Sequence, residues 1–198
     1  MLKPFYSCVG EAGTDEAGRG CLAGPVTAAA VILPEGFTHP VLNDSKQLRE
    51  DKRMALAEVI RKEALAFAVA HVEVATIDQI NILKAAIRAM HDSLDQLKIT
   101  PRAIAVDGNH FLSYRDIPHQ CLIKGDGRFL NIAAASILAK TSRDALMKEL
   151  HEEFPAYHWN SNKGYPTPAH REAIREYGPS PHHRRSFRLL EEQLKINF

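Results

Sequence analysis

Cysteine is scarce in this sequence, and a long run of apolar residues is missing. The chain of 198 residues has three cysteines, Cys8, Cys21 and Cys121, which form no CxxC pair and leave one over. This argues against a disulfide framework and a zinc site, and it favours reduced thiols. No apolar stretch approaches the length of about 20 residues that a membrane span needs, and Met1 to Phe5 do not resemble a signal peptide. We therefore expect a cytoplasmic protein without a membrane partner.

An excess of charge of one sign is also missing. The net charge is +1, with 25% charged and 45% hydrophobic residues, which is the composition of a soluble globular protein and does not by itself indicate a nucleic-acid binder. Basic residues do cluster, and each cluster is either a solvated helix face or a patch that contacts phosphates. The clusters are Lys46, Arg49, Lys52 and Arg53; Lys124 and Arg128; Lys140 and Arg143; and His182 to Arg185 with Arg188.

The length fits one α/β domain, and no repeat, low-complexity tract or linker interrupts it. We expect a single domain over residues 1–198, with a core of about 1–155 and a C-terminal segment of about 156–198. Apolar patterns predict five strands and four main helices, an irregular loop at 159–168 and a final helix after Phe187. The strands are expected at 8–14, 23–33, 67–74, 103–106 and 120–123, and the helices at 50–66, 76–97, 131–150 and 169–177.

Two adjacent carboxylates, Asp15 and Glu16, stand directly before a Gly-Arg-Gly turn. Neighbouring side chains of a strand point to opposite faces, so the two can serve one site only if the strand ends there. The following glycines supply such an end, and the backbone N–H groups of Gly18 and Gly20 can approach a phosphate or a sugar hydroxyl. Taken alone, the stretch is more typical of an ordinary acidic turn.

Two further carboxylates, Asp107 and Asp126, each follow a predicted strand and each adjoin glycine. Open α/β sheets gather their chemistry at the carboxyl ends of strands, although Asp-Gly is also a common turn. If the strands are neighbours, the four carboxylates converge, and they cannot all stay ionised without cations. Oxygen-only ligands point to Mg²⁺ or Mn²⁺, and two such ions suit phosphodiester hydrolysis.

Other polar residues have two interpretations. Lys46 suits a phosphate contact, but the spacing of the residues before it favours a helix cap. Ser136, Lys140 and Arg143 fall on one side of a predicted helix, where they would line a substrate groove or form a solvated stripe. Adjacent His182 and His183 suit phosphate contact or capping better than shared metal ligation.

Seven motifs in sequence order resemble those of the type 2 ribonucleases H, specifically the bacterial ribonuclease HII family. Together they reach from about residue 12 to 187. Any one of them is weak evidence, whereas all of them in register are a specific pattern. The motifs are Thr14-Asp15-Glu16-Ala17-Gly18-Arg19-Gly20, Asn43-Asp44-Ser45-Lys46-Gln47-Leu48, Asp107-Gly108-Asn109, Lys124-Gly125-Asp126, Ala134-Ala135-Ser136-Ile137-Leu138-Ala139-Lys140, Lys163-Gly164-Tyr165-Pro166-Thr167 and His182-His183-Arg184-Arg185-Ser186-Phe187.

The resemblance implies an α/β ribonuclease H-like fold, with a mixed central sheet, helices on both faces and a helical C-terminal extension that closes over the substrate. It implies an endonuclease that cuts RNA in RNA–DNA hybrids and incises 5′ of single ribonucleotides in duplex DNA, leaving 5′-phosphate and 3′-hydroxyl ends. Such an enzyme removes misincorporated ribonucleotides and RNA primers. We expect a monomer that uses two Mn²⁺ or Mg²⁺ ions.

The resemblance also assigns roles by position. Gly18-Arg19-Gly20 match the loop that senses the ribose 2′-hydroxyl, which is the group that distinguishes RNA from DNA. Tyr165 matches the tyrosine that packs on the sugar after the ribonucleotide, although its residue type and turn alone suggest a half-buried loop anchor. The metal-binding catalytic carboxylates of the family match Asp15, Glu16, Asp107 and Asp126, and further substrate contacts are predicted at Lys46, Ser136, Lys140 and Arg184.

Two other functions share part of this pattern. A nuclease of the same architecture that acts on DNA junctions would keep the carboxylates but would not need a 2′-hydroxyl sensor. A non-catalytic module that binds hybrids would be free to lose the carboxylates, because clustered acids weaken the attraction to a polyanion.

The last six residues, Gln193 to Phe198, resemble a peptide that binds a sliding clamp. The alternative, which the spacing favours, is the last turn of an amphipathic helix whose apolar side chains face the core.

Overall fold

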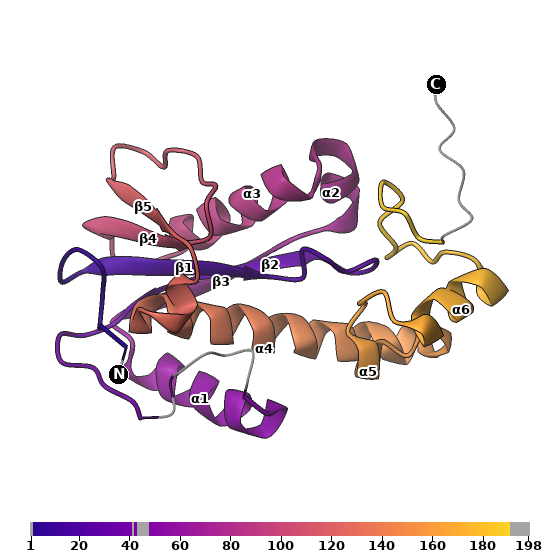
Figure 1. Ribbon diagram of the computed structural model, residues 1–198, viewed down its shortest axis with the longest axis horizontal. Helices are drawn as coiled ribbons and strands as arrows, with labels where there is room; N and C mark the ends of the chain where they lie inside the picture. Colours follow the sequence, from indigo (N-terminus) through magenta and orange to yellow (C-terminus); the bar gives the residue numbers. More distant parts are fainter. Residues whose placement is uncertain (1, 41, 43–47, 191–198) are drawn as a thin grey trace.

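A mixed sheet of five strands forms the centre of the computed structural model, which describes residues 2–40, 42 and 48–190 (Figure 1). The strand order is β3-β2-β1-β4-β5, with β1 antiparallel to β2, β2 antiparallel to β3, and β4 parallel to both β1 and β5. This confirms the mixed central sheet. The strands are β1 (Glu11–Ala17), β2 (Val26–Ile32), β3 (Ala66–Val72), β4 (Ala103–Asp107) and β5 (His119–Leu122).

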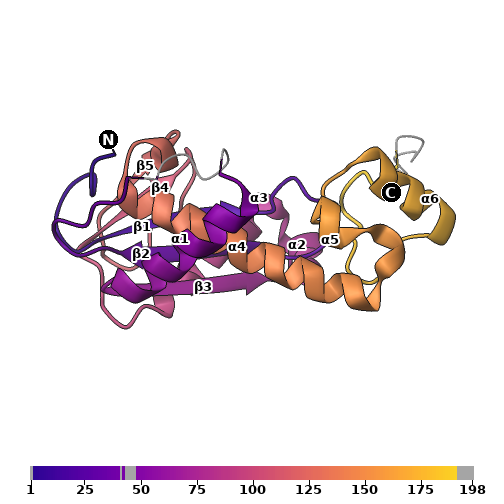
Figure 2. The same ribbon diagram turned by 90° about the horizontal axis from the view of Figure 1, so that it is seen from below.

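Helices cover both faces of the sheet, as the resemblance implied. Figure 1 shows α2 and α3 on one face and α1 and α4 on the other, and Figure 2 shows α5 beside the C-terminal part of α4, with α6 further out. No helix of the described residues is both long enough and apolar enough to cross a bilayer. The helices are α1 (Glu50–Glu63), α2 (Val74–Ile80), α3 (Ile82–Asp95), α4 (Leu130–Glu153), α5 (Trp159–Asn162) and α6 (Pro168–Tyr177), with short 3-10 turns η1 (Gly125–Gly127) and η2 (Pro155–Tyr157).

Strand β2 is buried on both faces, in keeping with a sequence that is apolar at every position except Thr27. Ala28 and Ala30 belong to the core cluster that includes α3, whereas Ala29 and Val31 belong to the cluster that includes α1 and α4. The alternation follows from the two-residue repeat of a strand. The sheet therefore separates two hydrophobic cores, one packed against each of its faces.

Helix α4 lies directly on β1 because Gly13 has no side chain. A β-carbon at Gly13 would come within 2.2 Å of the backbone carbon of Asn131, at the start of α4. Replacing the glycine would force helix and strand apart. This close approach places the polar side of α4 next to the carboxylates of β1.

Three predicted elements differ from the structure. The helix predicted at 76–97 is divided at Asn81, where φ is 68° and the side chain accepts hydrogen bonds from the N–H groups of Leu83 and Lys84. The loop predicted at 159–168 contains the short helix α5. Residues 188–190 are not helical, and the rest of the predicted final helix lies outside the described residues.

Candidate active site

Asp15 and Glu16 both lie inside β1, so the prediction that the strand ends at this pair is wrong. Strand β1 continues to Ala17 along β2, but its pairing with β4 stops at Thr14. On that side the two acidic residues extend past the last paired position, beside Asp107 at the end of β4. The end of the β1–β4 pairing, not the end of the strand, leaves room for both side chains near Asp107.

The carboxyl group of Asp15 is buried among other acids. It is 3% exposed, and its pKa is raised well above the usual value by burial and by the charges of Glu16 and Asp107. Two hydrogen bonds oppose this rise, one from the Ser136 hydroxyl and one from the N–H of Glu16 at 2.7 Å. The carboxylate is thus held in place by α4 while it is repelled by its neighbours.

Among these acidic residues, Glu16 has a side chain that is partly exposed to solvent. Burial raises its pKa, and the charge of Asp107 adds to the rise. Arg19 opposes both effects, because its Nη1 donates to Glu16 Oε1 at 3.0 Å. The Gly-Arg-Gly loop therefore folds its arginine back over the carboxylate that precedes it.

Asp126 is brought to the site by Asp107. Asp107 Oδ1 accepts hydrogen bonds from the N–H groups of Gly125 at 2.7 Å and of Asp126 at 3.4 Å. These bonds attach η1, which follows β5, to the end of β4. Asp126 is 5% exposed, and its Oδ1 accepts from the N–H of Gly127 at 2.9 Å. The two strand-carboxylate-glycine patterns of the sequence thus lie at neighbouring strand ends, which these hydrogen bonds connect.

The donor chemistry of these four groups fits a hard divalent cation. All the donors are carboxylate oxygens, and a bound cation would relieve the repulsion that, in addition to burial, raises the pKa of Asp15 and Glu16. Within the described ranges, however, no three His, Cys, Asp or Glu side chains are grouped as a set of metal ligands. The structure therefore shows mutually repelling acidic neighbours and not a formed coordination sphere.

A pocket of about 390 Å³ opens next to Glu16, and most of the residues predicted to contact the substrate line it. Tyr165 is 40% exposed there; its hydroxyl hydrogen bonds to the Cys21 thiol, and Lys140 Nζ lies 5.5 Å from its ring centroid. Lys140 also donates to Asp144 Oδ1 at 2.6 Å. The lining residues are Glu16, Ala17, Gly18, Arg19, Gly20, Arg53, Ser136, Lys140 and Tyr165.

Arg184 does not line this pocket, which corrects the prediction of a direct substrate contact. Its side chain is fully buried, and its guanidinium donates to the carbonyl oxygens of Arg19 at 3.0 Å, Gly24 at 2.9 and 3.0 Å, and Pro25 at 3.1 Å. Burial lowers the pKa of Arg184 to about 10. The residue holds the loop that follows β1 from within. Lys46, the other basic prediction, lies outside the described residues.

Arg143 neither lines the pocket nor belongs to a solvated stripe. It is fully buried, and it donates to the carbonyl oxygens of Ala23, Pro25 and Lys163 at 2.8 to 3.0 Å. It therefore connects the loop after β1 to the turn that carries Tyr165. Sequence spacing placed Arg143 on the correct helix but could not show that three distant carbonyl groups surround it.

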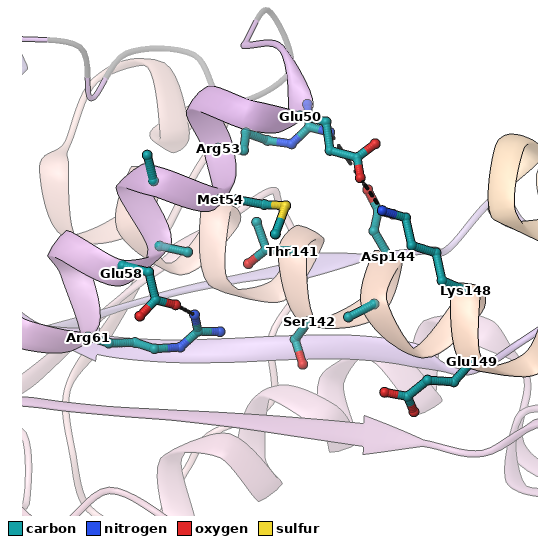
Figure 3. A pocket seen from close by; sticks show the side chains of 13 residues that line it. Glu50, Arg53, Met54, Glu58, Arg61, Thr141, Ser142, Asp144, Lys148 and Glu149 are labelled. Atoms are coloured by element: carbon teal, nitrogen blue, oxygen red, sulfur yellow. Dashed lines mark hydrogen bonds and ion pairs between the residues drawn. The ribbon is translucent and has the colours of Figure 1, made fainter.

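Arg53 is a pocket residue that was predicted only as a member of a basic cluster. It also lines a larger pocket of about 660 Å³ between α1 and α4 (Figure 3), and its Nη2 lies 3.7 Å from Asp144 Oδ2. Lys148 and Glu50 form an ion pair of 2.5 Å across the larger pocket. None of the four predicted catalytic carboxylates lines that larger pocket, so the smaller one is the candidate active site.

A mixed sheet with this strand order, and with acidic side chains gathered where the β1–β4 pairing stops, has the ribonuclease H-like fold. A family model described as Ribonuclease HII matches residues 12–190. The chain belongs to this family, whose members are endonucleases, and this confirms the resemblance seen in the sequence.

Relatives cover the chain completely. It is 61% identical over 200 residues to ribonuclease HII of Bacteroides thetaiotaomicron and 58% identical over 198 residues to that of Christiangramia forsetii, with all of both chains covered in each case.

Solved structures share the fold. The ribonuclease H2 from Pyrococcus horikoshii OT3 is 26% identical with a TM-score of 0.76, covering 90% of this chain and 94% of that one. A ribonuclease HII from Archaeoglobus fulgidus, solved in complex with PCNA, is 26% identical with a TM-score of 0.74, covering 88% and 92%. Bst-RNase HIII, solved in complex with Mn²⁺, is 20% identical with a TM-score of 0.63, covering 85% and 62%, which shows similarity of fold alone.

Proposed function

We propose that this endoribonuclease hydrolyses the RNA strand of RNA–DNA hybrids and incises 5′ of single ribonucleotides embedded in duplex DNA. The observation that carries the proposal is the pocket in which the Gly18–Gly20 backbone, Tyr165 and Glu16 face one space. A substrate sugar in that space would meet backbone groups, an aromatic ring and the edge of an acidic site together. Such an enzyme would serve the removal of misincorporated ribonucleotides and RNA primers.

The four carboxylates would hold two Mg²⁺ or Mn²⁺ ions. When bound, two such ions would stabilise the charge on both the attacking water and the leaving oxygen of an in-line displacement. The chain itself contributes burial and mutual repulsion of the carboxylates, which raise the pKa of Asp15 and Glu16 and which a bound cation would offset. It also contributes the orientation of Asp15, which Ser136 and the backbone of Glu16 fix by hydrogen bonds. The products would carry 5′-phosphate and 3′-hydroxyl ends.

Recognition of the ribose would fall to the Gly18–Gly20 loop and Tyr165. Gly18 has a φ of 93°, which favours glycine, and this conformation turns the chain away from the strand. Arg19 and Gly20 are exposed at the pocket rim. A 2′-hydroxyl can both donate and accept a hydrogen bond, so backbone groups at the rim suit it. The Tyr165 ring supplies an apolar surface for the next sugar.

Hydrolysis of an RNA–DNA hybrid tests the catalytic part of the proposal. The RNA strand should be cut internally with Mg²⁺ or Mn²⁺ and should stay intact with a chelator, and the new ends should be 5′-phosphate and 3′-hydroxyl. Cutting at the same rate in the chelator, or ends with 3′-phosphate, would contradict the metal-dependent mechanism.

The variant Asp126→Asn tests whether this protein is an enzyme or a module that only binds hybrids. Turnover should fall by about 100-fold or more, because even residues that only support a metal ligand cost about 10- to 100-fold when they are replaced, while hybrid binding in the presence of Ca²⁺ stays within a few-fold of the parent. Unchanged turnover would remove Asp126 from the mechanism. Equal cutting of an all-DNA junction would favour the alternative nuclease.

A sliding clamp is a candidate partner through residues 193–198, which lie outside the described residues. Support comes from the last six residues of the sequence and from the Archaeoglobus fulgidus ribonuclease HII, whose structure was solved with PCNA. Deleting residues 193–198 should abolish clamp binding and leave hydrolysis unchanged. Absence of clamp binding by the full chain would end this proposal.

A further inference from the structure

Tyr165 is held from behind by His170, a residue that does not line the pocket. His170 lies near the start of α6 and is fully buried. Its Nδ1 is 2.8 Å from the carbonyl oxygen of Tyr165, which also accepts from the N–H of Thr167 at 2.8 Å. Because a carbonyl oxygen can only accept, Nδ1 of His170 carries the proton of this contact.

Two donors on the other side of the ring fix the same tautomer. Trp159 Nε1 donates to His170 Nε2 at 3.0 Å, and an indole nitrogen can only donate, so that imidazole nitrogen carries no proton. His183 Nε2 lies 3.1 Å from the same nitrogen and must therefore be its second donor. His183 Nδ1 is then the acceptor for the N–H and the hydroxyl of Ser180, both at 2.9 Å.

These hydrogen bonds thus assign the imidazole proton of each histidine to one nitrogen. His170 is protonated on Nδ1 and His183 on Nε2, and both rings are neutral. Burial lowers the pKa of both histidines. In addition, a second proton on His170 Nε2 would point at the two N–H groups of Trp159 and His183. Turning the His170 ring over would place a C–H against the Tyr165 carbonyl and leave the indole of Trp159 without its acceptor. The ring orientation is therefore fixed from both sides.

The backbone of Tyr165 connects this cluster to the pocket, because His170 bonds to its carbonyl group and its side chain lines the pocket. The N–H of Tyr165 donates to the carbonyl of Asn162 at 2.9 Å, so both of its backbone groups are bonded. The exposed ring then has its hydroxyl at Cys21 and Lys140 above its face. A shift of the carbonyl would move the ring relative to the Gly18–Gly20 loop.

We propose that His170 is a positioning residue that sets the Tyr165 side chain in the substrate pocket through its Nδ1–H bond to the Tyr165 carbonyl. Trp159 and His183 fix the ring that makes this bond. The inference rests on the proposed role of Tyr165 as a substrate contact. His183, which was predicted to contact a phosphate or to cap a helix, is instead buried against His170 in this cluster.

Two variants of His170 test separately its hydrogen bond to Tyr165 and its acceptor role toward Trp159 and His183. His170→Gln can keep an acceptor for Trp159 and His183 but loses the donor to Tyr165, whereas His170→Asn can keep that donor and loses the acceptor. In the full-length protein, His170→Gln should lower kcat/KM on a duplex with one ribonucleotide by about 10- to 100-fold, the scale of a misplaced contact. His170→Asn should lower it by much less, even where it is the less stable of the two. The reverse order would overturn the proposal.

A double-mutant cycle with Tyr165→Ala shows whether His170 acts through Tyr165. In the Tyr165→Ala background, His170→Gln should have almost no further effect, because the ring that it misplaces is absent. An equal loss in both backgrounds would overturn the role of His170 alone. No loss from Tyr165→Ala by itself would instead contradict the proposed function of Tyr165.

Nitrogen-15 NMR of the unsubstituted protein gives a readout that does not depend on folding of a variant or on activity. His170 should be the Nδ1–H tautomer and His183 the Nε2–H tautomer. The opposite tautomer at His170 would remove the bond to Tyr165 and with it the proposal.

Discussion

Gly18 lies against Arg143 so closely that a β-carbon on Gly18 would come within 2.0 Å of Arg143 Nε. The backbone there has a φ of 93°, so a side chain would be strained even without a neighbour. Arg143 cannot retreat easily, because all three of its nitrogens donate to backbone carbonyl groups. The Gly18–Gly20 loop therefore packs against the buried guanidinium of Arg143 at a position where only glycine has room.

Gly18→Ala and Gly20→Ala form a matched pair that tests this fit. Nothing lies within 4 Å of a β-carbon at Gly20, so Gly20→Ala should change stability by less than about 0.5 kcal/mol. Gly18→Ala should destabilise the fold by about 1–3 kcal/mol through overpacking and should lower kcat/KM more than Gly20→Ala does. Thermal unfolding and single-turnover rates measure both. Equal effects of the two variants would contradict the assigned contact.

Asp15→Asn should stabilise the metal-free protein while it removes activity. The carboxyl pKa of Asp15 is raised by burial and by Glu16 and Asp107, so the charge at position 15 is unfavourable at neutral pH. An amide keeps an oxygen that can accept from Ser136 and from the backbone. With a chelator present, stability should rise by about 0.5–2 kcal/mol, seen as a higher Tm. A lower Tm would contradict the repulsion described for this site.

Arg184 and Arg185 are neighbours with different surroundings. Arg184 is buried and donates to three backbone carbonyl groups, whereas Arg185 is exposed. Arg184→Ala should lower stability by about 3 kcal/mol because it leaves buried acceptors unpaired. Arg185→Ala should stay within about 0.5 kcal/mol. Urea unfolding at pH 7 distinguishes them; a loss at Arg185 that matches the loss at Arg184 would contradict the structural role.

Stability should depend on the neutral form of His183, whose pKa is lowered to about 3 by burial and by nearby His170. The unfolded chain takes up this proton at its ordinary pKa of about 6.5, so the contribution is complete above pH 6.5 and is lost as pH falls toward 3. The slope for one proton is about 1.4 kcal/mol per pH unit.

Acidic groups of the active site act in the opposite direction. Asp15 and Glu16 have raised pKa values, so the folded state binds their protons more tightly and gains stability as pH falls. The measurement is therefore a comparison of unfolding free energies at pH 7 and pH 5 for the parent and for His183→Asn, which keeps an acceptor for Ser180. The variant should lose less stability on acidification; the same loss in both proteins would contradict the prediction.

The sequence predicted those features whose signals are local. Asp107 and Asp126 each lie near the end of a predicted strand and adjoin a glycine, and the structure joins them by a hydrogen bond from the N–H of Asp126 to the carboxylate of Asp107. The break at Asn81 was missed because the apolar stripe continues in register on both sides of it. Arg184 was misplaced for a different reason: its acceptors lie about 160 residues earlier in the chain, and its sequence neighbours are polar. Basic motifs show which residues matter without showing whether they face a substrate or a carbonyl group.

The most direct test of the proposed function is the incision of a DNA duplex that contains one ribonucleotide, beside the same duplex without it. Both are incubated with Mg²⁺ or Mn²⁺ and with a chelator. We expect metal-dependent incision on the 5′ side of the ribonucleotide and no cutting of the all-DNA duplex, so that one 2′-hydroxyl decides the reaction. No incision of the first duplex, or equal cutting of both, would contradict the roles proposed for the Gly18–Gly20 loop and Tyr165.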